Sequence, residues 1–414
     1  MIRLFSIALL VSSLFPFVTL VRFGFDSQPY ACIFAIFLIA TVSIKKPIYL
    51  TPHFYGFLLT FVLALFTLVH NLFIYSNFDW FTSFRSMFTL LSIPICVIAF
   101  LNAKLTPEDI FIYLKRTILI YGIVGLVQFF YRGFLSFLIA RSSTSGERGV
   151  YSLTVEPVEY SRMCLFLFIM LALFKMYRYC NNKTFLRYTL LLLFQAVVLS
   201  LSGTGFSWVA VMLVIYLLTN SSISKGKLLA VFVGCVILIS GIAYLGIMFF
   251  PEKRVFFLLS LAFENPEQLS QFAGFVLRTL NPIHSFLVGI IMFKGCGVGL
   301  GFPGSTETVD YSFLGPMFKD TVIDLSGRSH GGLSSLIYEL GILSIPYILY
   351  IFSILFKNYN FSNHNVNAKF LIYSFLLLIL FDGPISSAIL GLIIALFYIL
   401  PKKQKFENNI LYTT

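Results

Sequence analysis

Long apolar runs follow one another along almost the whole chain, separated by short polar connections. Hydrophobic amino acids make up 58% of the 414 residues, charged residues only 11%, and the mean hydropathy is +0.92. A soluble domain would need far more charge on its surface. The runs are continuous rather than alternating, which suits helices crossing a hydrocarbon layer of roughly 30 Å and not the strands of a β-barrel. The sequence therefore predicts an all-α integral membrane protein.

Hydropathy divides the chain into about twelve membrane-spanning helices. Several are short, and one short pair is also compatible with a re-entrant hairpin. The first run has no small-residue cleavage site before Arg22, so we interpret it as a span rather than a signal peptide. The expected spans are 4–21, 28–44, 54–75, 86–101, 117–134, 159–177, 188–202, 204–219, 228–249, 332–356, 370–381 and 385–400.

The distribution of charge predicts the orientation of these helices. Lysines and arginines gather in short connections that the positive-inside rule assigns to the cytoplasm, whereas nearly all acidic residues fall in the opposite connections. Both termini are therefore expected in the cytoplasm, and the net charge of +12 indicates orientation rather than nucleic-acid binding. The expected divisions are N-terminal membrane helices (1–134), a first outward loop (135–158), central membrane helices (159–249), a long outward loop (250–331) and C-terminal membrane helices with a cytoplasmic tail (332–414).

The long outward loop is too polar to lie in lipid. Within it, 254–263 and 268–280 are expected to form amphipathic helices on the membrane surface, and 283–293 is apolar enough to dip into it. The segment GCGVGLGFPG resembles a dinucleotide motif only superficially, because no strand and helix are expected around it. We expect its glycines to supply backbone flexibility. The six cysteines are scattered, and no histidines have metal-ligand spacing, so neither a disulfide framework nor a metal site is predicted.

Arginines in the first outward loop suggest an anion site. Arg141 and Arg148 lie in a segment rich in serine, threonine and glycine, with Glu156 close behind. The guanidinium fork matches phosphate oxygens bidentately, so this pair suits a diphosphate. The alternative is a solvated loop with interfacial arginines. Glu159 and Arg162, three residues apart on the opening turn of a span, are expected to pair with each other.

Histidine 330 is the most distinctive residue of the long loop. It precedes a span and follows Arg328, so a cation and a helix N-terminus both favour its neutral form, which is the form a general base needs. The alternative is an interfacial histidine at a helix cap, and Arg278 alone equally suits an arginine reaching the headgroups. Glu339 lies inside the following span, where a charge costs about 2.5–3.5 kcal/mol and needs a loop arginine or protonation to compensate it.

Four segments together resemble the O-antigen polymerase and O-antigen ligase superfamily, the Wzy-type bacterial membrane glycosyltransferases. They are RGVYSLTVEP at 148–157, SLSGTGF at 200–206, Arg278 with the apolar stretch leading to GCGVGLG, and SHGGLSSLIYELG at 329–341. The resemblance runs from about 141 to 341; earlier residues share hydropathy only. Gly331 departs from the family, in which a polar residue often follows the histidine.

The resemblance implies a metal-independent, GT-C-like fold that needs no cofactor and transfers a glycan from undecaprenyl diphosphate to an acceptor hydroxyl. It implies that His330 is the base or the acceptor-positioning residue. Arg278, with Arg148 or Arg141, would stabilise the departing diphosphate. We add Arg328, Glu156 and Glu339 as candidate substrate-binding residues.

Polymerisation of lipid-linked repeat units into O-antigen or a similar surface polysaccharide is the function we favour. The expected partners are the undecaprenyl-diphosphate-linked oligosaccharide, as donor and acceptor, membrane lipid, and optionally a chain-length regulator. The expected location is the bacterial cytoplasmic (inner) membrane, with the site facing the periplasm or cell exterior. A ligase that transfers the glycan to lipid A-core or another acceptor would use the same residues. A transporter or flippase is the rival of a different class, and it should carry its polar residues near mid-membrane and often show repeats.

Overall fold

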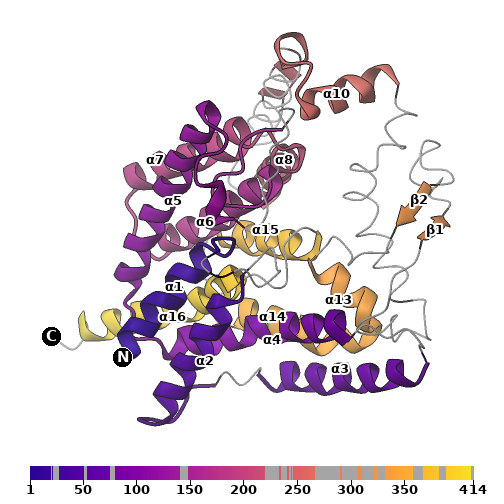
Figure 1. Cartoon of the computed structure of the whole chain (residues 1–414). Coiled ribbons are helices and arrows are strands. Elements are labelled where there is room, and N and C mark those ends of the chain that lie inside the picture. Colours follow the sequence, from indigo (N-terminus) through magenta and orange to yellow (C-terminus); the bar gives the residue numbers. More distant parts are fainter. Residues whose placement is uncertain are drawn as a thin grey trace.

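The described part of the chain is helical apart from one short pair of strands (Figure 1). The computed structural model describes residues 1–19, 21, 28–50, 54–74, 80–139, 148–219, 233–234, 240–241, 244, 246–265, 290, 306–309, 321–324, 332–357, 367–381 and 388–411. The helices of its first half are α1 (Ile2–Leu14), α2 (Tyr30–Ser43), α3 (Phe54–Ile74), α4 (Trp80–Asn102), α5 (Pro107–Phe130), α6 (Pro157–Met176), α7 (Asn182–Leu193) and α8 (Gly203–Thr219).

The second half continues with α10 (Arg254–Glu264), α13 (Gly332–Leu340), α14 (Ile345–Lys357), α15 (Asn367–Phe381) and α16 (Ala388–Leu411). Strands β1 (Thr306–Val309) and β2 (Thr321–Asp324) pair antiparallel, with Thr306 opposite Asp324. The sequence analysis expected no strand in this loop, because neither segment alternates apolar and polar residues over the usual strand length.

Three helices are long and apolar enough to cross a membrane: Pro107–Phe130, Pro157–Met176 and Gly332–Ser353. Seven shorter apolar helices accompany them in the described residues. The chain is therefore a helical membrane protein, as its composition predicts. The expected count of twelve spans and the GT-C-like arrangement remain predictions, as do the sidedness and the domain divisions.

Helix boundaries differ from the expected spans where local chemistry extends or interrupts a helix. α5 begins ten residues before the expected span, because Thr106 and Asp109 form a capping box and Pro107 takes the first helical position. The expected span 332–356 is divided between α13 and α14 by a 3-10 turn at Gly341–Ser344, where Gly341 has a φ of 53°. α16 runs on to Leu411, past the expected end of the last span.

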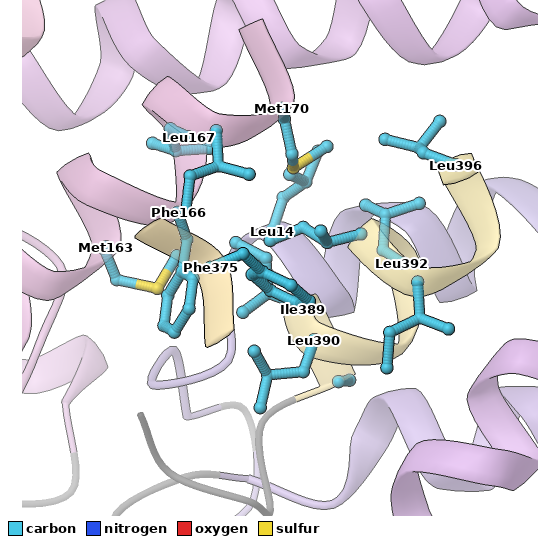
Figure 2. Packing of buried hydrophobic residues seen from close by; sticks show 14 of the residues in the cluster. Leu14, Met163, Phe166, Leu167, Met170, Phe375, Ile389, Leu390, Leu392 and Leu396 are labelled. Carbon is cyan, nitrogen blue, oxygen red and sulfur yellow. The ribbon is translucent and has the colours of Figure 1, made fainter. Parts of the chain in front are cut away.

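Helix α6 forms the centre of the bundle. It packs against α5, α7, α8, α15 and α16, and nearly all of its side chains after the first turn are buried. Figure 2 shows Met163, Phe166, Leu167 and Met170 of α6 lying against Phe375 of α15. Residues of α16 and of α1 close the same cluster, among them Ile389, Leu390, Leu392, Leu396 and Leu14. The apolar core thus joins the first and last helices of the chain to its middle.

Helices α5, α6 and α7 also pack against one another, and their order fixes what lies at each end (Figure 1). α5 and α7 run in one direction and α6 returns between them. The C-terminal end of α5, the loop before α6 and the turn after α7 therefore meet at one end, which we call the loop end. The start of α5, the end of α6 and the start of α7 meet at the opposite end.

Candidate functional site

The predicted site residues fall into two groups. Arg148, Glu156 and Glu339 are described by the structure. The others, Arg141, Arg278, Arg328 and His330, lie outside the described residues, as does the expected helix at 268–280. The helix expected at 254–263 is confirmed as α10, over Arg254–Glu264.

The segment before α6 is a packed part of the protein rather than a solvated loop. Residues 150–155 are all buried, although they include Ser152 and Thr154. The backbone N–H of Val150 donates a hydrogen bond to the carbonyl of Leu199 at 2.9 Å. The alternative of a solvated loop is therefore wrong for these residues. The segment docks on the turn 200–202, which leads into α8.

Buried hydrogen bonds fix this segment to α5. The hydroxyl of Ser152 donates to the backbone carbonyl of Tyr121 at 2.8 Å. The side-chain amide of Gln128 donates to the carbonyls of Ser152 and Phe134, each at 2.9 Å. Ser152 has a φ of 50°, in the left-handed region that few residues other than glycine adopt. These bonds satisfy the backbone of an irregular segment in a place where water is scarce.

A second buried network ties α6 and α7 to the same part of α5. The hydroxyl of Tyr160 lies 3.1 Å from the carbonyl of Tyr121 and 3.2 Å from the side-chain oxygen of Gln195. The amide of Gln195 donates to the carbonyl of Ile118 at 3.1 Å. Gln195 is fully buried and belongs to a π-helical turn at Phe194–Leu199. Such turns insert an extra residue into a helix and often occur at functional sites.

At the rim of this packed segment Arg148 and Glu156 form an ion pair. Their Nη1 and Oε2 atoms are 3.4 Å apart, and about three-tenths of each side chain is exposed. The guanidinium of Arg132, at the end of α5, donates to the backbone carbonyl of Arg148 at 3.1 Å. Tyr151 returns a hydrogen bond to the carbonyl of Arg132 at 2.9 Å. The rim thus presents two arginines and one carboxylate, held from below by buried bonds.

This arrangement suits a partly exposed anion site. An ion pair as open to water as Arg148–Glu156 contributes about 0–1 kcal/mol, so an anionic ligand can replace Glu156 at little cost. The guanidinium of Arg132, which is bonded to the backbone carbonyl of Arg148, adds a second planar donor group to the rim. Within the described residues no group of three His, Cys, Asp or Glu side chains could hold a metal ion.

The structure pairs Arg148 with Glu156. It places Glu339 in a different helix, α13. Glu339 lies in α13, all of whose residues are buried, and α13 packs against α15 and the turn Gly341–Ser344. The expected pairing of Glu159 with Arg162 on the first turn of α6 is confirmed.

Sequence reasoning missed Arg132, Gln128, Tyr160 and Gln195. The two glutamines carried a usable signal, because an uncharged amide inside an apolar span is expensive unless it is bonded and so marks a constrained place. Arg132 had no such signal, because a single arginine near the end of an expected span is typical of an interfacial residue.

No family model matches the chain, and the comparisons find no similar curated protein and no similar solved structure. The family and function given by the resemblance are therefore taken up below as proposals.

Proposed function

We propose that the chain is a Wzy-type membrane glycosyltransferase, which polymerises undecaprenyl-diphosphate-linked repeat units into O-antigen or a similar surface polysaccharide. The observation that carries the proposal is the contact between two segments of the resemblance. RGVYSLTVEP at 148–157 and SLSGTGF at 200–206 are about 45 residues apart along the chain, yet Val150 bonds to Leu199 and Gly149 lies against Ser200. Two segments of the resemblance therefore meet at one end of the bundle.

The chemistry of the rim agrees with binding of the lipid diphosphate. Arg148 is partly exposed: its backbone carbonyl accepts a hydrogen bond from Arg132, and its guanidinium pairs weakly with Glu156. Tyr151 bonds in turn to the carbonyl of Arg132. A diphosphate offers each guanidinium a pair of oxygens, so it matches the planar fork of an arginine better than one carboxylate oxygen does. The apolar outer faces of the helices give the lipid chain a place to lie beside the rim.

In the proposed reaction the acceptor hydroxyl oxygen bonds to the anomeric carbon of the donor sugar while the bond from that carbon to the diphosphate breaks. The hydroxyl proton passes to the neutral imidazole of His330. The electron pair of the broken bond leaves with undecaprenyl diphosphate, and Arg148 and Arg278 stabilise the charge that develops there. Arg141, Arg328, Glu156 and Glu339 are proposed substrate contacts. His330 and Arg278 take these roles from the sequence.

The test is polymerisation by the purified protein in detergent, given an undecaprenyl-diphosphate-linked repeat unit from its own host and followed by a gel. The expected result is a ladder that disappears in His330→Ala and weakens in Arg148→Lys and Arg278→Lys, because lysine keeps the charge but loses the fork. Lys253→Gln is the matched control, because Lys253 also faces a carboxylate, that of Glu252 at 3.9 Å, in a segment expected on the same side.

Other outcomes of this assay would contradict part or all of the proposal. Transfer to a supplied lipid A-core, without a ladder, would identify a ligase. Neither product from a well-folded protein would overturn the glycosyltransferase and favour a transporter. A normal ladder from His330→Ala would remove His330 from the mechanism, and full activity in Arg148→Lys would reduce the rim arginine to a structural residue.

A further inference from the structure

The end of α5, α6 and α7 opposite the loop end carries a group of cations. Lys115 and Arg116 lie on the early turns of α5, Lys175 on the last turn of α6 and Arg178 just beyond it. Lys183 and Arg187 follow on the first turns of α7. Because the three helices pack against one another, these residues gather from three elements at one end of the bundle. We call the six residues the basic end.

The centre of the basic end is defined by contacts between α5 and α6. The ring of Phe111 lies 5.2 Å from that of Phe174, and the Nζ atom of Lys115 lies 4.9 Å from the centre of the Phe111 ring. Burial raises the pKa of the Cys180 thiol, while the charges of Lys175 and Lys115 lower it. Both lysines are therefore close enough to the Cys180 thiol for their charges to affect it.

In the part of the chain that the structure describes, no carboxylate pairs with this group. Asp109, near the start of α5, is already engaged with Thr106 in the capping box. Six cations with no carboxylate partner among the described residues repel one another, and an anion from outside the chain would relieve that repulsion.

The backbone at Arg178 gives a second, independent indication. Arg178 has a φ of 64°, the left-handed conformation with which helices commonly end and for which glycine is strongly preferred. The chain folds back there, with the N–H of Tyr179 donating to the carbonyl of Phe174 at 2.9 Å. Glycine would suit this turn better, and the side chain of Arg178 is exposed. The presence of arginine therefore indicates a use for its charge.

Apolar faces continue from the basic end along the same helices. Ile112 on α5 is 41% exposed, and Leu186 and Leu190 on α7 are 59% and 57% exposed. An anion with acyl chains can bury these faces while its phosphate meets the cations, whereas a free phosphate cannot. We propose that the basic end binds the phosphate headgroup of an anionic phospholipid, with Lys115, Lys175 and Arg178 as its main contacts. This site is separate from the rim at Arg148 and does not depend on the proposed function.

The test counts phospholipids bound to the purified protein by native mass spectrometry. The protein is titrated with phosphatidylglycerol or with phosphatidylcholine of the same acyl chains. A triple variant, Lys115→Gln/Lys175→Gln/Arg178→Gly, is compared with a control of equal charge change, Lys45→Gln/Lys46→Gln/Lys253→Gln, whose residues lie just after α2 and just before α10.

We expect the wild-type protein to prefer phosphatidylglycerol, and the triple variant to bind it at least tenfold more weakly than the control does. The charge-preserving pair Lys115→Arg/Lys175→Arg should bind like the wild type. If the triple variant does not fold, Arg178→Gly alone, which fits the backbone, should weaken binding about fivefold.

Equal losses in the triple variant and the control would mean general charge attraction and would overturn the site. So would unchanged binding in the triple variant, or equal binding of phosphatidylcholine. Displacement of the lipid by millimolar inorganic phosphate would show that the cations take free phosphate, which also overturns the proposal.

Discussion

Replacing Gly149 by alanine should separate the packed segment 150–155 from the turn after α7. A Cβ atom at residue 149 would lie 2.0 Å from the carbonyl oxygen of Ser200 and 2.6 Å from that of Leu199. Both are backbone atoms, so no side-chain rotation can relieve the clash. The two segments must move apart by about 1 Å or more to reach an ordinary contact. That movement breaks the hydrogen bond from Val150 to Leu199.

The expected cost follows from these two effects. Overpacking of this kind costs about 1–3 kcal/mol, and the lost buried hydrogen bond adds about 1 kcal/mol. Together they predict a loss of about 2–4 kcal/mol and a melting temperature several degrees lower. Fluorescence-detected size-exclusion chromatography after heating, in detergent, measures the shift.

Gly203→Ala is the matched control for this prediction. A Cβ atom there would have Val255 as its nearest neighbour, at an ordinary 3.8 Å, so its stability should stay close to that of the wild type. The reasoning is refuted if Gly149→Ala melts at the wild-type temperature, or if both variants lose the same amount.

Three further predictions concern the buried network and the basic end. Gln195→Leu should lower the free energy of unfolding by about 1–3 kcal/mol, since Tyr160 and the carbonyl of Ile118 lose their partner; an unchanged thermal midpoint would contradict this. Arg178→Gly should raise it by about 1 kcal/mol in lipid-free detergent, because glycine adopts the left-handed turn without strain, and a lower melting temperature would disprove it. Cys180 should react with a maleimide more slowly as pH falls and with a pH midpoint above that of a free thiol, because burial raises its pKa; Lys175→Gln should move the midpoint higher still, and a downward shift would exclude Lys175 from its surroundings.

The sequence was a good guide to local structure. Helices at 30–43, 54–74 and 203–219 match expected spans within about two residues, because a continuous apolar run leaves the backbone no other way to satisfy its hydrogen bonds in lipid. The ion pair of Glu159 with Arg162 was predictable for a similar reason, since helical geometry alone places residues three apart side by side.

Boundaries were less predictable where polar chemistry acts on the helix. The capping box at Thr106 lengthened α5 into residues that hydropathy assigned to a connection. The left-handed Gly341 divided a run that hydropathy read as continuous. In both places one or two residues decide where the helix begins or breaks, and they barely change the mean hydropathy of the span.

Two residues of the rim could be chosen from the sequence, but their surroundings could not. Arg148 and Glu156 were chosen from charge and loop chemistry, and the structure pairs them. The supports beneath them are bonds to backbone carbonyls across 24 to 77 residues of sequence: Gln128 of α5 bonds to Ser152, and Tyr160 and Gln195 bond to carbonyls of α5. Every residue has a backbone carbonyl, so the type of the accepting residue does not reveal such a bond. These pairings therefore could not be predicted from the sequence.

The sequence by itself determined that this protein is a bundle of membrane helices, because its apolar runs exclude a water-facing surface. Tertiary structure alone decided that the segment before α6 is buried and that it lies against the turn after α7. It also decided that the cations at the ends of α5, α6 and α7, most of which the charge distribution already assigned to one side of the membrane, lie on helices packed against one another. The physical reason is the same in each case. Hydropathy is a property of one segment of the chain at a time, whereas contacts between segments depend on how α6 packs between α5 and α7.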